Sequence, residues 1–318
     1  SPWKPAIKIK EAADYCYEVY QDIIPKITKE MNNLNNTAYP IRYWDILLGP
    51  WLLHFIGIIY DRYVRMNTAI RLFPDLYTHA LPQEQCDISS LDTLDCFRVK
   101  VVDDSYNLRL FSLINYEIHP QSIIETTLSI PAPKKYISEY RYNWRAKIFN
   151  YLVKDFLSRG SIMLVDMYHL RNFDKLFLKF SSGFNKIGFM DFVDENKSIL
   201  NSLKFNEKLR RNINLGESNS EFHSLLHKII PRAMPICYIE GYKTYSQYID
   251  NMKNIDKVKI LGSPIGWYYN EIFKFFAAKL VLNNAKLIDF QHGGGYSIYL
   301  SIVPETISLE KDIFYVWG

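Results

Sequence analysis

The last third of the chain alternates between short apolar runs and one long helical pattern, and this order constrains the fold more than any other feature. Residues 256–264 (DKVKILGSP) and 286–295 (KLIDFQHGGG) each predict a strand that runs into a loop. Residues 266–285 predict the helix between them, and residues 312–318 (DIFYVWG) predict another strand after a shorter helix. Strands that alternate with helices at this spacing form parallel sheets through right-handed crossovers. We therefore expect an α/β fold with a Rossmann-like parallel sheet and flanking helices.

The start of the chain lacks this alternation and predicts helices. Apolar residues recur at helical spacing over residues 9–30, where we expect Pro25 to interrupt the helix. Residues 41–70 predict a short helix, a break before Pro50 and then a long helix. The most apolar run, residues 46–60, contains Gly-Pro and a histidine, which favours a buried helix over a membrane span.

These patterns divide the chain into two parts. We expect a helical N-terminal segment, residues 1–80, packed on a Rossmann-like α/β domain, residues 81–318. The strand predicted at residues 312–318 stops without a cap, so we expect the natural protein to continue beyond it.

Composition and missing motifs exclude several functions. The net charge of +4, from 38 basic and 34 acidic residues, is too small to indicate nucleic-acid binding. The four cysteines lack CxxC spacing, so neither a disulfide framework nor a zinc knuckle is predicted, and a reducing cytoplasm fits them. The GxGxxG, GxxxxGK[ST] and GxSxG motifs are absent. His223 and His227 are one helical turn apart but lack the HExxH pattern, so a surface or core pair is favoured over a zinc site.

Two loops leave predicted strands of the same α/β unit. One contains Gly262 and Ser263, and the other runs from His292 through three glycines. Loops that follow neighbouring parallel strands meet at the carboxyl edge of the sheet, where α/β proteins bind ligands. Three glycines allow the backbone to approach a ligand phosphate closely, and a helix that begins after Gly295 would direct free N–H groups at it. The alternative is that the glycines form only a tight turn, which His292 caps.

Two carboxylates end apolar runs elsewhere in the chain. Glu240 follows PICYI, and Asp166 follows IMLV. A carboxylate at a strand end can act as a general base when burial tunes its pKa. The alternative for both residues is a structural one, in which they cap a helix or pair with a nearby cation.

Several blocks of the sequence resemble a family of transferases from bacterial O-antigen and surface-polysaccharide gene clusters. The blocks are RYWDILLGPWLLHFIGIIYDRY, PICYIEGY, NEIFKFFAAKLVLNNAKLIDFQHGGGYS and YVWG. The resemblance implies a GT-B-like glycosyltransferase, in which two Rossmann-like domains face each other across a cleft. It also implies a second α/β domain after residue 318 that holds most of the nucleotide-sugar donor, and a strand before the first residue. The family's glycine motif maps onto Gln291, His292, Gly293, Gly294 and Tyr296, with Ser297 where a glycine is expected.

We therefore predict a cytoplasmic glycosyltransferase that moves a sugar from a nucleotide-sugar donor to a bacterial surface glycan of the O-antigen or capsule type. The acceptor is a glycan or a lipid-linked glycan, and peripheral association with the inner face of the membrane is left open. No metal, other cofactor or nucleic acid is expected. The alternative is a non-catalytic scaffold module that binds a glycan or a nucleotide. The catalytic candidates are His292, Glu240 and Asp166, and the candidate binding residues are Gly262, Ser263, Gln291, Gly293, Gly294, Gly295 and Tyr296.

Overall fold

The computed structural model describes residues 2–127, 131, 158–167, 169–218, 220–291, 293 and 312–316. The chain forms two compact units, each built from separate stretches of sequence. Unit 1 comprises Ser1–Ile41, Trp51–Tyr136 and Leu203–Tyr242, and unit 2 comprises Arg42–Pro50, Ile137–Ser202 and Lys243–Gly318. The division therefore differs from a single boundary at residue 80, because segments far apart in sequence share a core.

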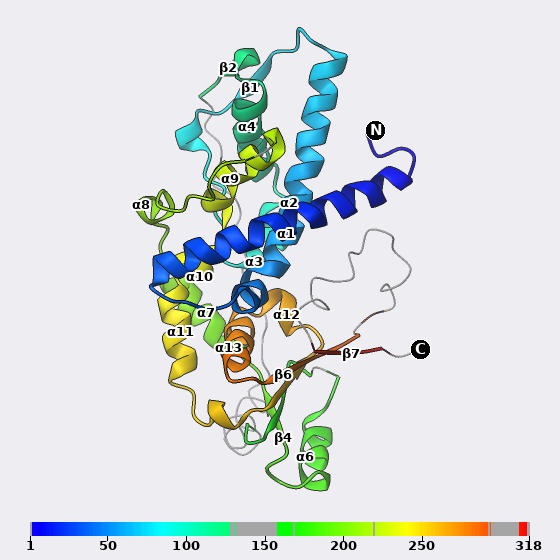
Figure 1. Ribbon diagram of the computed structural model, residues 1–318, viewed down its shortest axis with the longest axis vertical. Helices are drawn as coiled ribbons and strands as arrows, with labels where there is room; N and C mark the ends of the chain where they lie inside the picture. The colour runs from blue at the N-terminus through cyan, green and yellow to red at the C-terminus, as the bar shows by residue number, and fades with distance from the viewer. Residues whose placement is uncertain are drawn as a thin grey trace. The chain divides into compact units, whose positions relative to one another are not determined.

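Unit 1 is mainly helical (Figure 1). Its helices are α1 (Ile7–Asn35), the part of α2 (Ile41–Leu72) from Trp51 onward, α3 (Thr93–Asp95), α4 (Asp104–Ile118), α8 (Glu207–Arg210), α9 (Glu221–Ala233) and α10 (Ile236–Ile239). Two short strands, β1 (Thr78–Ala80) and β2 (Ile123–Glu125), pair in parallel. Tyr15 of α1, Tyr60 of α2 and Phe222 of α9 pack together, with ring centroids 5.1 Å apart for Tyr15–Tyr60 and for Tyr60–Phe222. This aromatic cluster joins three helices into one core.

Both long helices continue through a proline, so the expected breaks at Pro25 and Pro50 are wrong. The reason in α1 is its buried face, which runs on across Pro25 to Met31. Burial of that apolar face offsets the one hydrogen bond that the proline removes. The helix ends instead at Asn36, whose left-handed conformation lets its N–H bond to the carbonyls of Asn32 and Asn33.

Unit 2 contains a five-stranded parallel sheet, which confirms the predicted parallel α/β sheet. The strands are β3 (Ile162–Val165), β4 (Ile187–Met190), β5 (Ile260–Ser263), β6 (Lys286–Phe290) and β7 (Ile313–Tyr315), in the order β4-β3-β5-β6-β7. Counted along the chain this is the order 2-1-3-4-5 of doubly wound, flavodoxin-like sheets. The three strands predicted in the last third of the chain are β5, β6 and β7, and they are consecutive neighbours in the sheet.

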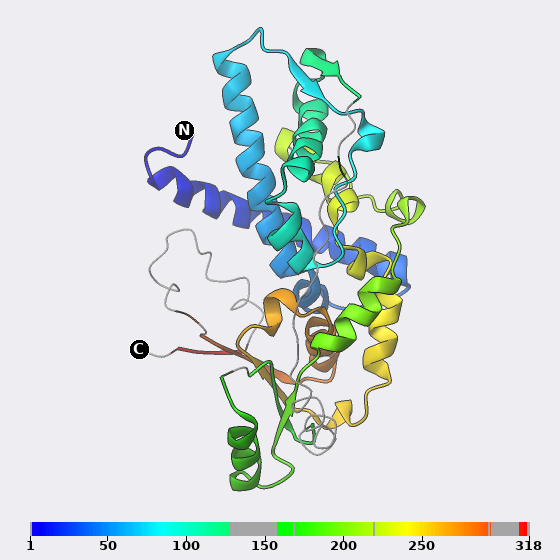
Figure 2. The same ribbon diagram turned by 180° about the vertical axis from the view of Figure 1, so that it is seen from behind.

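Helices connect these strands as right-handed crossovers would require. Helix α6 (Asn172–Ser181) joins β3 to β4, and α13 (Glu271–Leu282) joins β5 to β6. These two helices lie on opposite faces of the sheet in both views (Figures 1 and 2). Helix α7 (Val193–Ser202) contacts α13, and this unit also contains α11 (Tyr242–Asp250), α12 (Gly266–Tyr269) and the start of α2, from Arg42 to Pro50.

One helix of the described part of the chain, α2, is long and apolar enough to cross a membrane by length and composition. In its most apolar window 78% of the residues are buried inside the protein. Core helices of soluble proteins meet the same test, so this finding is weak support for a span.

Candidate functional site

The carboxyl edge of the sheet in unit 2 contains a topological switch point between β3 and β5. From β3 the chain continues to β4 on one side, and from β5 it continues to β6 on the other. The two connections diverge from the carboxyl ends of these strands, and ligands of open α/β sheets bind at such a point. Asp166 follows β3 directly, and Ser263 is the last residue of β5.

Backbone and side-chain bonds hold Asp166 at this point. The residue has a φ of +55°, in the left-handed region that aspartate and asparagine tolerate better than most residues. Its N–H donates to the carbonyl of Met190 at the end of β4, over 3.3 Å. Its Oδ2 accepts a hydrogen bond from Nδ2 of Asn270 over 2.8 Å. Asn270 is also the N-cap of α13, because its Oδ1 accepts from the N–H of Phe273.

The environment of Asp166 favours its neutral form. The pKa of this carboxyl is raised to about 7, mainly by burial and also by the negative charge of Asp191, while the hydrogen bond from Asn270 and the charge of Lys175 act in the opposite direction. Part of the residue is exposed to solvent, but its carboxyl is buried enough for desolvation to be the largest cause of the shift. A carboxyl with a pKa near 7 exchanges a proton readily at neutral pH, which is what general acid–base catalysis requires.

Asp191 and Asn270 are not among the residues predicted from the sequence. Asp191 follows β4, so the sequence IGFMD repeats the pattern of IMLVD, an apolar strand that ends in aspartate. This repeat was a signal that could have identified Asp191. Asn270 carries only the general pattern of a helix N-cap, and nothing local connects it to Asp166, which lies 104 residues earlier.

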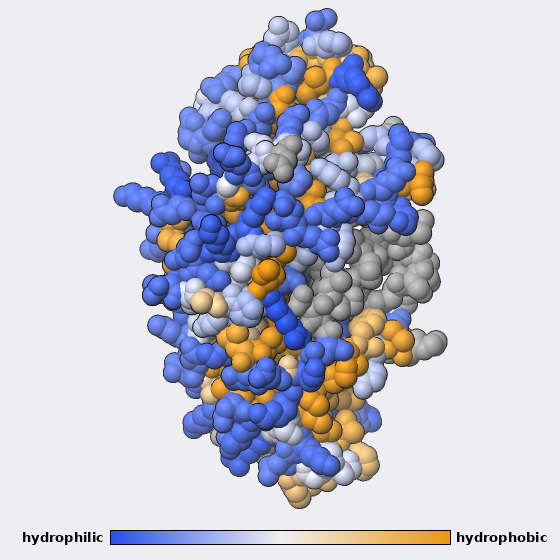
Figure 3. Space-filling model, viewed as in Figure 1, coloured by the Kyte–Doolittle hydropathy of each residue, from blue (hydrophilic) through white to orange (hydrophobic). Residues whose placement is uncertain are grey.

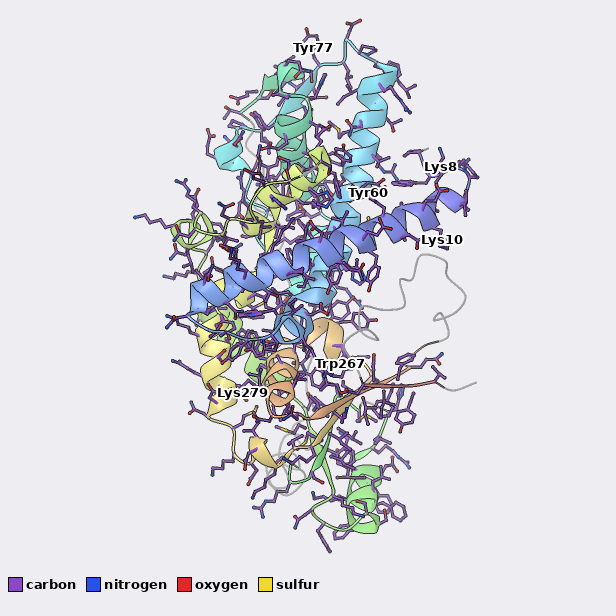
Figure 4. The ribbon with its side chains drawn as sticks, in the orientation of Figure 1. Lys8, Lys10, Tyr60, Tyr77, Trp267 and Lys279 are labelled. Atoms are coloured by element: carbon purple, nitrogen blue, oxygen red, sulfur yellow. The ribbon has the colours of Figure 1, made fainter. Side chains whose placement is uncertain are left out.

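Gly262 and Ser263 lie at the expected edge, but their contacts are internal. The Ser263 side chain is fully buried, and its Oγ accepts from the N–H of Gly266 over 2.9 Å. The Ser263 carbonyl accepts from Nε1 of Trp267 over 2.7 Å, and Figure 4 shows this tryptophan on α12. A Cβ at position 262 would lie 2.9 Å from the Phe290 ring. Both residues therefore shape the turn after β5.

The glycine loop leaves β6 next to the turn after β5, since Ser263 and Asp289 are paired in the parallel register. His292, Gly294, Gly295 and Tyr296 lie outside the described residues. Gln291 donates its N–H to the carbonyl of Tyr315 over 2.8 Å and its Nε2 to the carbonyl of Gly293 over 2.7 Å. A Cβ added at Gly293 would meet no atom of the described residues within 4 Å.

Glu240 does not follow a strand, and that expectation is wrong. The run before it forms the short helix α10, because Pro235 sets an extended N-cap from which the chain turns into a helix. Glu240 and Arg210 form a buried bidentate ion pair, with Nε–Oε1 and Nη2–Oε2 distances of 2.8 Å. Oε1 also accepts the N–H of Asn206 over 2.9 Å. The structure therefore shows the structural alternative for Glu240, a pair with a cation.

The histidine pair on α9 contacts nearby residues, and Nε2 of His223 also lies 3.6 Å from Oδ2 of Asp22. Nδ1 of His223 lies 2.7 Å from Oγ of Ser220, and Nδ1 of His227 lies 3.0 Å from the carbonyl of Gly216. Across the described residues, no cluster of three or more His, Cys, Asp or Glu side chains is arranged to hold a metal ion.

The comparisons with known proteins show the family of this chain and its general enzyme class. No curated protein and no solved structure matches the chain. One family model, described as LIC12162 family transferase, matches residues 1–318. The match spans both compact units and every residue of the candidate site. The chain belongs to the LIC12162 family of transferases.

Proposed function

We propose that this transferase is a glycosyltransferase, which moves a sugar from a nucleotide donor to the hydroxyl of a bacterial surface glycan of the O-antigen or capsule type. The observation that carries the proposal is Asp166, a carboxyl with a pKa of about 7 at the switch point of a doubly wound sheet. Transfer to a hydroxyl needs a group that accepts its proton near neutral pH. The resemblance to transferases of surface-polysaccharide gene clusters supports the choice of sugar as the transferred group.

In the proposed reaction Asp166 is the general base. Its ionised carboxylate accepts the proton of the acceptor hydroxyl as the oxygen forms a bond to the anomeric carbon of the sugar. The bond between that carbon and the donor phosphate breaks, and the nucleotide leaves with the electron pair. Asn270 keeps the carboxylate oriented through its hydrogen bond to Oδ2. His292, as proposed from the sequence, donates to the leaving phosphate oxygens or carries the proton itself.

The donor phosphates have proposed partners in the loop after β6. The glycines that follow His292 would place backbone N–H groups near them, and none of the described residues has an atom in the space that a Cβ at Gly293 would take. In a GT-B arrangement, a second α/β domain would hold most of the nucleotide across the cleft. We place the reaction in the cytoplasm at the inner face of the membrane, where lipid-linked acceptors are assembled.

The test compares wild-type enzyme with Asp166→Asn in the natural full-length protein. The donors are UDP- and GDP-linked hexoses and CMP-linked ulosonic acids, and nucleotide binding is measured by calorimetry. We expect Asp166→Asn to bind the nucleotide normally and to lose about 10²–10⁴-fold in transfer rate, the usual contribution of a general base. Asp256→Asn, at an exposed residue before β5, is the matched control. Undiminished transfer by Asp166→Asn, or no binding of any nucleotide by the wild type, would contradict the proposal.

A further inference from the structure

Helix α6 turns its apolar face outward. Phe173, Phe177 and Phe180 recur at helical spacing on one face, and Phe184 follows in the next turn. Their exposed fractions are 74%, 62%, 54% and 53% in that order, and the rings of Phe180 and Phe184 pack edge to face at 5.0 Å. We call these four residues the Phe face. A surface helix ordinarily buries its apolar stripe, so this orientation needs a physical cause.

The cause lies on the opposite side of the helix, at Lys179. This lysine is fully buried, and its ammonium group donates hydrogen bonds to the carbonyl of Arg159 and, over 3.0 Å, to that of Ile187. A rotation of the helix that buried the Phe face would remove Lys179 from these carbonyls. Buried polar groups that lose their partners are costly, so the hydrogen bonds hold the phenyl rings outward.

Basic residues outnumber acidic ones in and around α6, and at helical spacing Arg171 and Lys175 lie on the side away from the Phe face. Residues 171–186 contain Arg171, Lys175 and Lys186 in addition to the buried Lys179, and their one acidic residue is Asp174. Asp174 accepts a hydrogen bond from Arg171 over 3.2 Å, so it offsets one of the three outer cations. The surface of this helix therefore combines exposed aromatic rings with a surplus of positive charge.

We propose that residues 172–186 bind the surface of an anionic bilayer, with the Phe face inserted at the boundary between headgroups and acyl chains. Apolar surface gathers in the region where Figure 1 places α6 (Figure 3). Four phenyl rings exposed to this degree present roughly 500 Å² of apolar area, taking about 200 Å² for a whole side chain. A stable contact with a second copy buries about 800 Å² of total surface on each partner, which the four rings alone do not supply. Amphipathic helices with aromatic rings on one face and basic residues on the polar face bind lipid interfaces.

The test measures cosedimentation of the full chain with vesicles of phosphatidylcholine, with and without phosphatidylglycerol. We expect wild-type protein to bind the mixed vesicles, to bind the neutral ones more weakly, and to lose affinity as salt is added. The variant Phe177→Ser/Phe180→Ser should bind the mixed vesicles at least about tenfold more weakly, because two rings no longer enter the interface. Its matched control is Leu72→Ser/Phe73→Ser, which changes two residues that are each 63% exposed.

This inference rests on α6 alone and is independent of the proposed reaction. The mutated rings are exposed, so the double variant should keep the thermal midpoint of the wild type. Wild-type protein that stays in the supernatant, or a double variant that binds like the wild type, would overturn the proposal. A wild-type dimer that becomes a monomer in the double variant would also overturn it, because the Phe face would then be a protein interface.

Discussion

Asn270 donates a hydrogen bond to Asp166 over 2.8 Å and at the same time caps helix α13. One side chain therefore links the N-terminus of a helix to a carboxyl group at the end of β3. The pKa of Asp166 therefore depends on Asn270, which affects it through this hydrogen bond without having to contact the substrate.

Replacing Asn270 by serine should shift the pH dependence of the transferase. Serine can still cap α13 but is too short to reach Asp166, so a hydrogen bond that lowers the pKa of this carboxyl is lost. A hydrogen bond to a charged group contributes about 1.5–3 kcal/mol, which corresponds to roughly one to two pKa units. We expect the acidic limb of kcat/KM against pH to move upward by about one unit or more, with the rate recovering at higher pH.

The matched control for this variant is Asn206→Ser, since Asn206 caps the short helix α8 through the N–H of Leu209. It should leave the pH profile unchanged. If Asn270→Ser lowers only the thermal midpoint and leaves the profile in place, Asn270 acts as a cap alone.

Replacing Asp166 by asparagine should stabilise the protein above neutral pH. The folded-state pKa of about 7 exceeds the ordinary value of 3.8, so the folded state binds this proton more tightly than the unfolded state does. Ionisation of Asp166 therefore lowers the free energy of unfolding as pH rises from about 4 to 7, by at most about 4 kcal/mol at 1.36 kcal/mol per pKa unit. Asparagine tolerates the same positive φ and lacks this penalty.

Urea denaturation at several pH values measures this effect. The stability gain of Asp166→Asn over the wild type should be small near pH 4, grow up to pH 7 and stay constant above it. A variant that is less stable than the wild type at pH 8 would show that the carboxylate has a structural role.

Replacing Glu240 by glutamine should reduce stability and spare the chemistry. The change leaves the Arg210 guanidinium buried without its counter-charge, and the side chains of both residues are more than 90% buried, with exposed fractions of 6% and 3%. Removing one partner of a buried ion pair typically costs about 3–5 kcal/mol. We expect a loss of this order in chemical denaturation and an unchanged transfer rate per folded molecule.

The nearby pair of Glu207 and Arg211 provides the control, because both side chains are exposed and 2.7 Å apart. Glu207→Gln should cost less than about 1 kcal/mol. Normal stability of Glu240→Gln together with abolished transfer would instead make Glu240 a catalytic residue.

The glycine loop supplies the last prediction. If backbone there approaches a phosphate, Gly293→Ala should keep the wild-type thermal midpoint, since the added Cβ meets no atom of the described residues, but should weaken donor binding. His292→Ala should lose about 10²–10⁴-fold in transfer rate if His292 carries a proton. Normal donor affinity in the first variant and normal turnover in the second would show that the loop is only a turn.

The parallel sheet could be predicted from local sequence because each strand carries its own signal. The strands β5, β6 and β7 are short apolar runs that end in loops, separated by helix-length segments, and this order admits few topologies. The location of Asp166 at a strand end followed from the same pattern. The predicted helix breaks at Pro25 and Pro50 were wrong. The cost of a proline inside a helix is about 3 kcal/mol, and burial of the helix on both sides of the proline outweighs it.

The sequence alone therefore established the alternation of strands and helices, the parallel sheet and a carboxylate at one of its carboxyl ends, because neighbouring residues encode each of these features. The contacts that these residues make with segments far away in sequence could be seen only in the tertiary structure. Asn270 and Asp191 reach Asp166 only through the sheet, Arg210 reaches Glu240 from 30 residues away, and Lys179 sets the orientation of α6 through the carbonyls of Arg159 and Ile187. A pKa, a buried ion pair and an outward-facing aromatic stripe depend on burial and on distances between segments remote in sequence, and neither quantity is encoded locally.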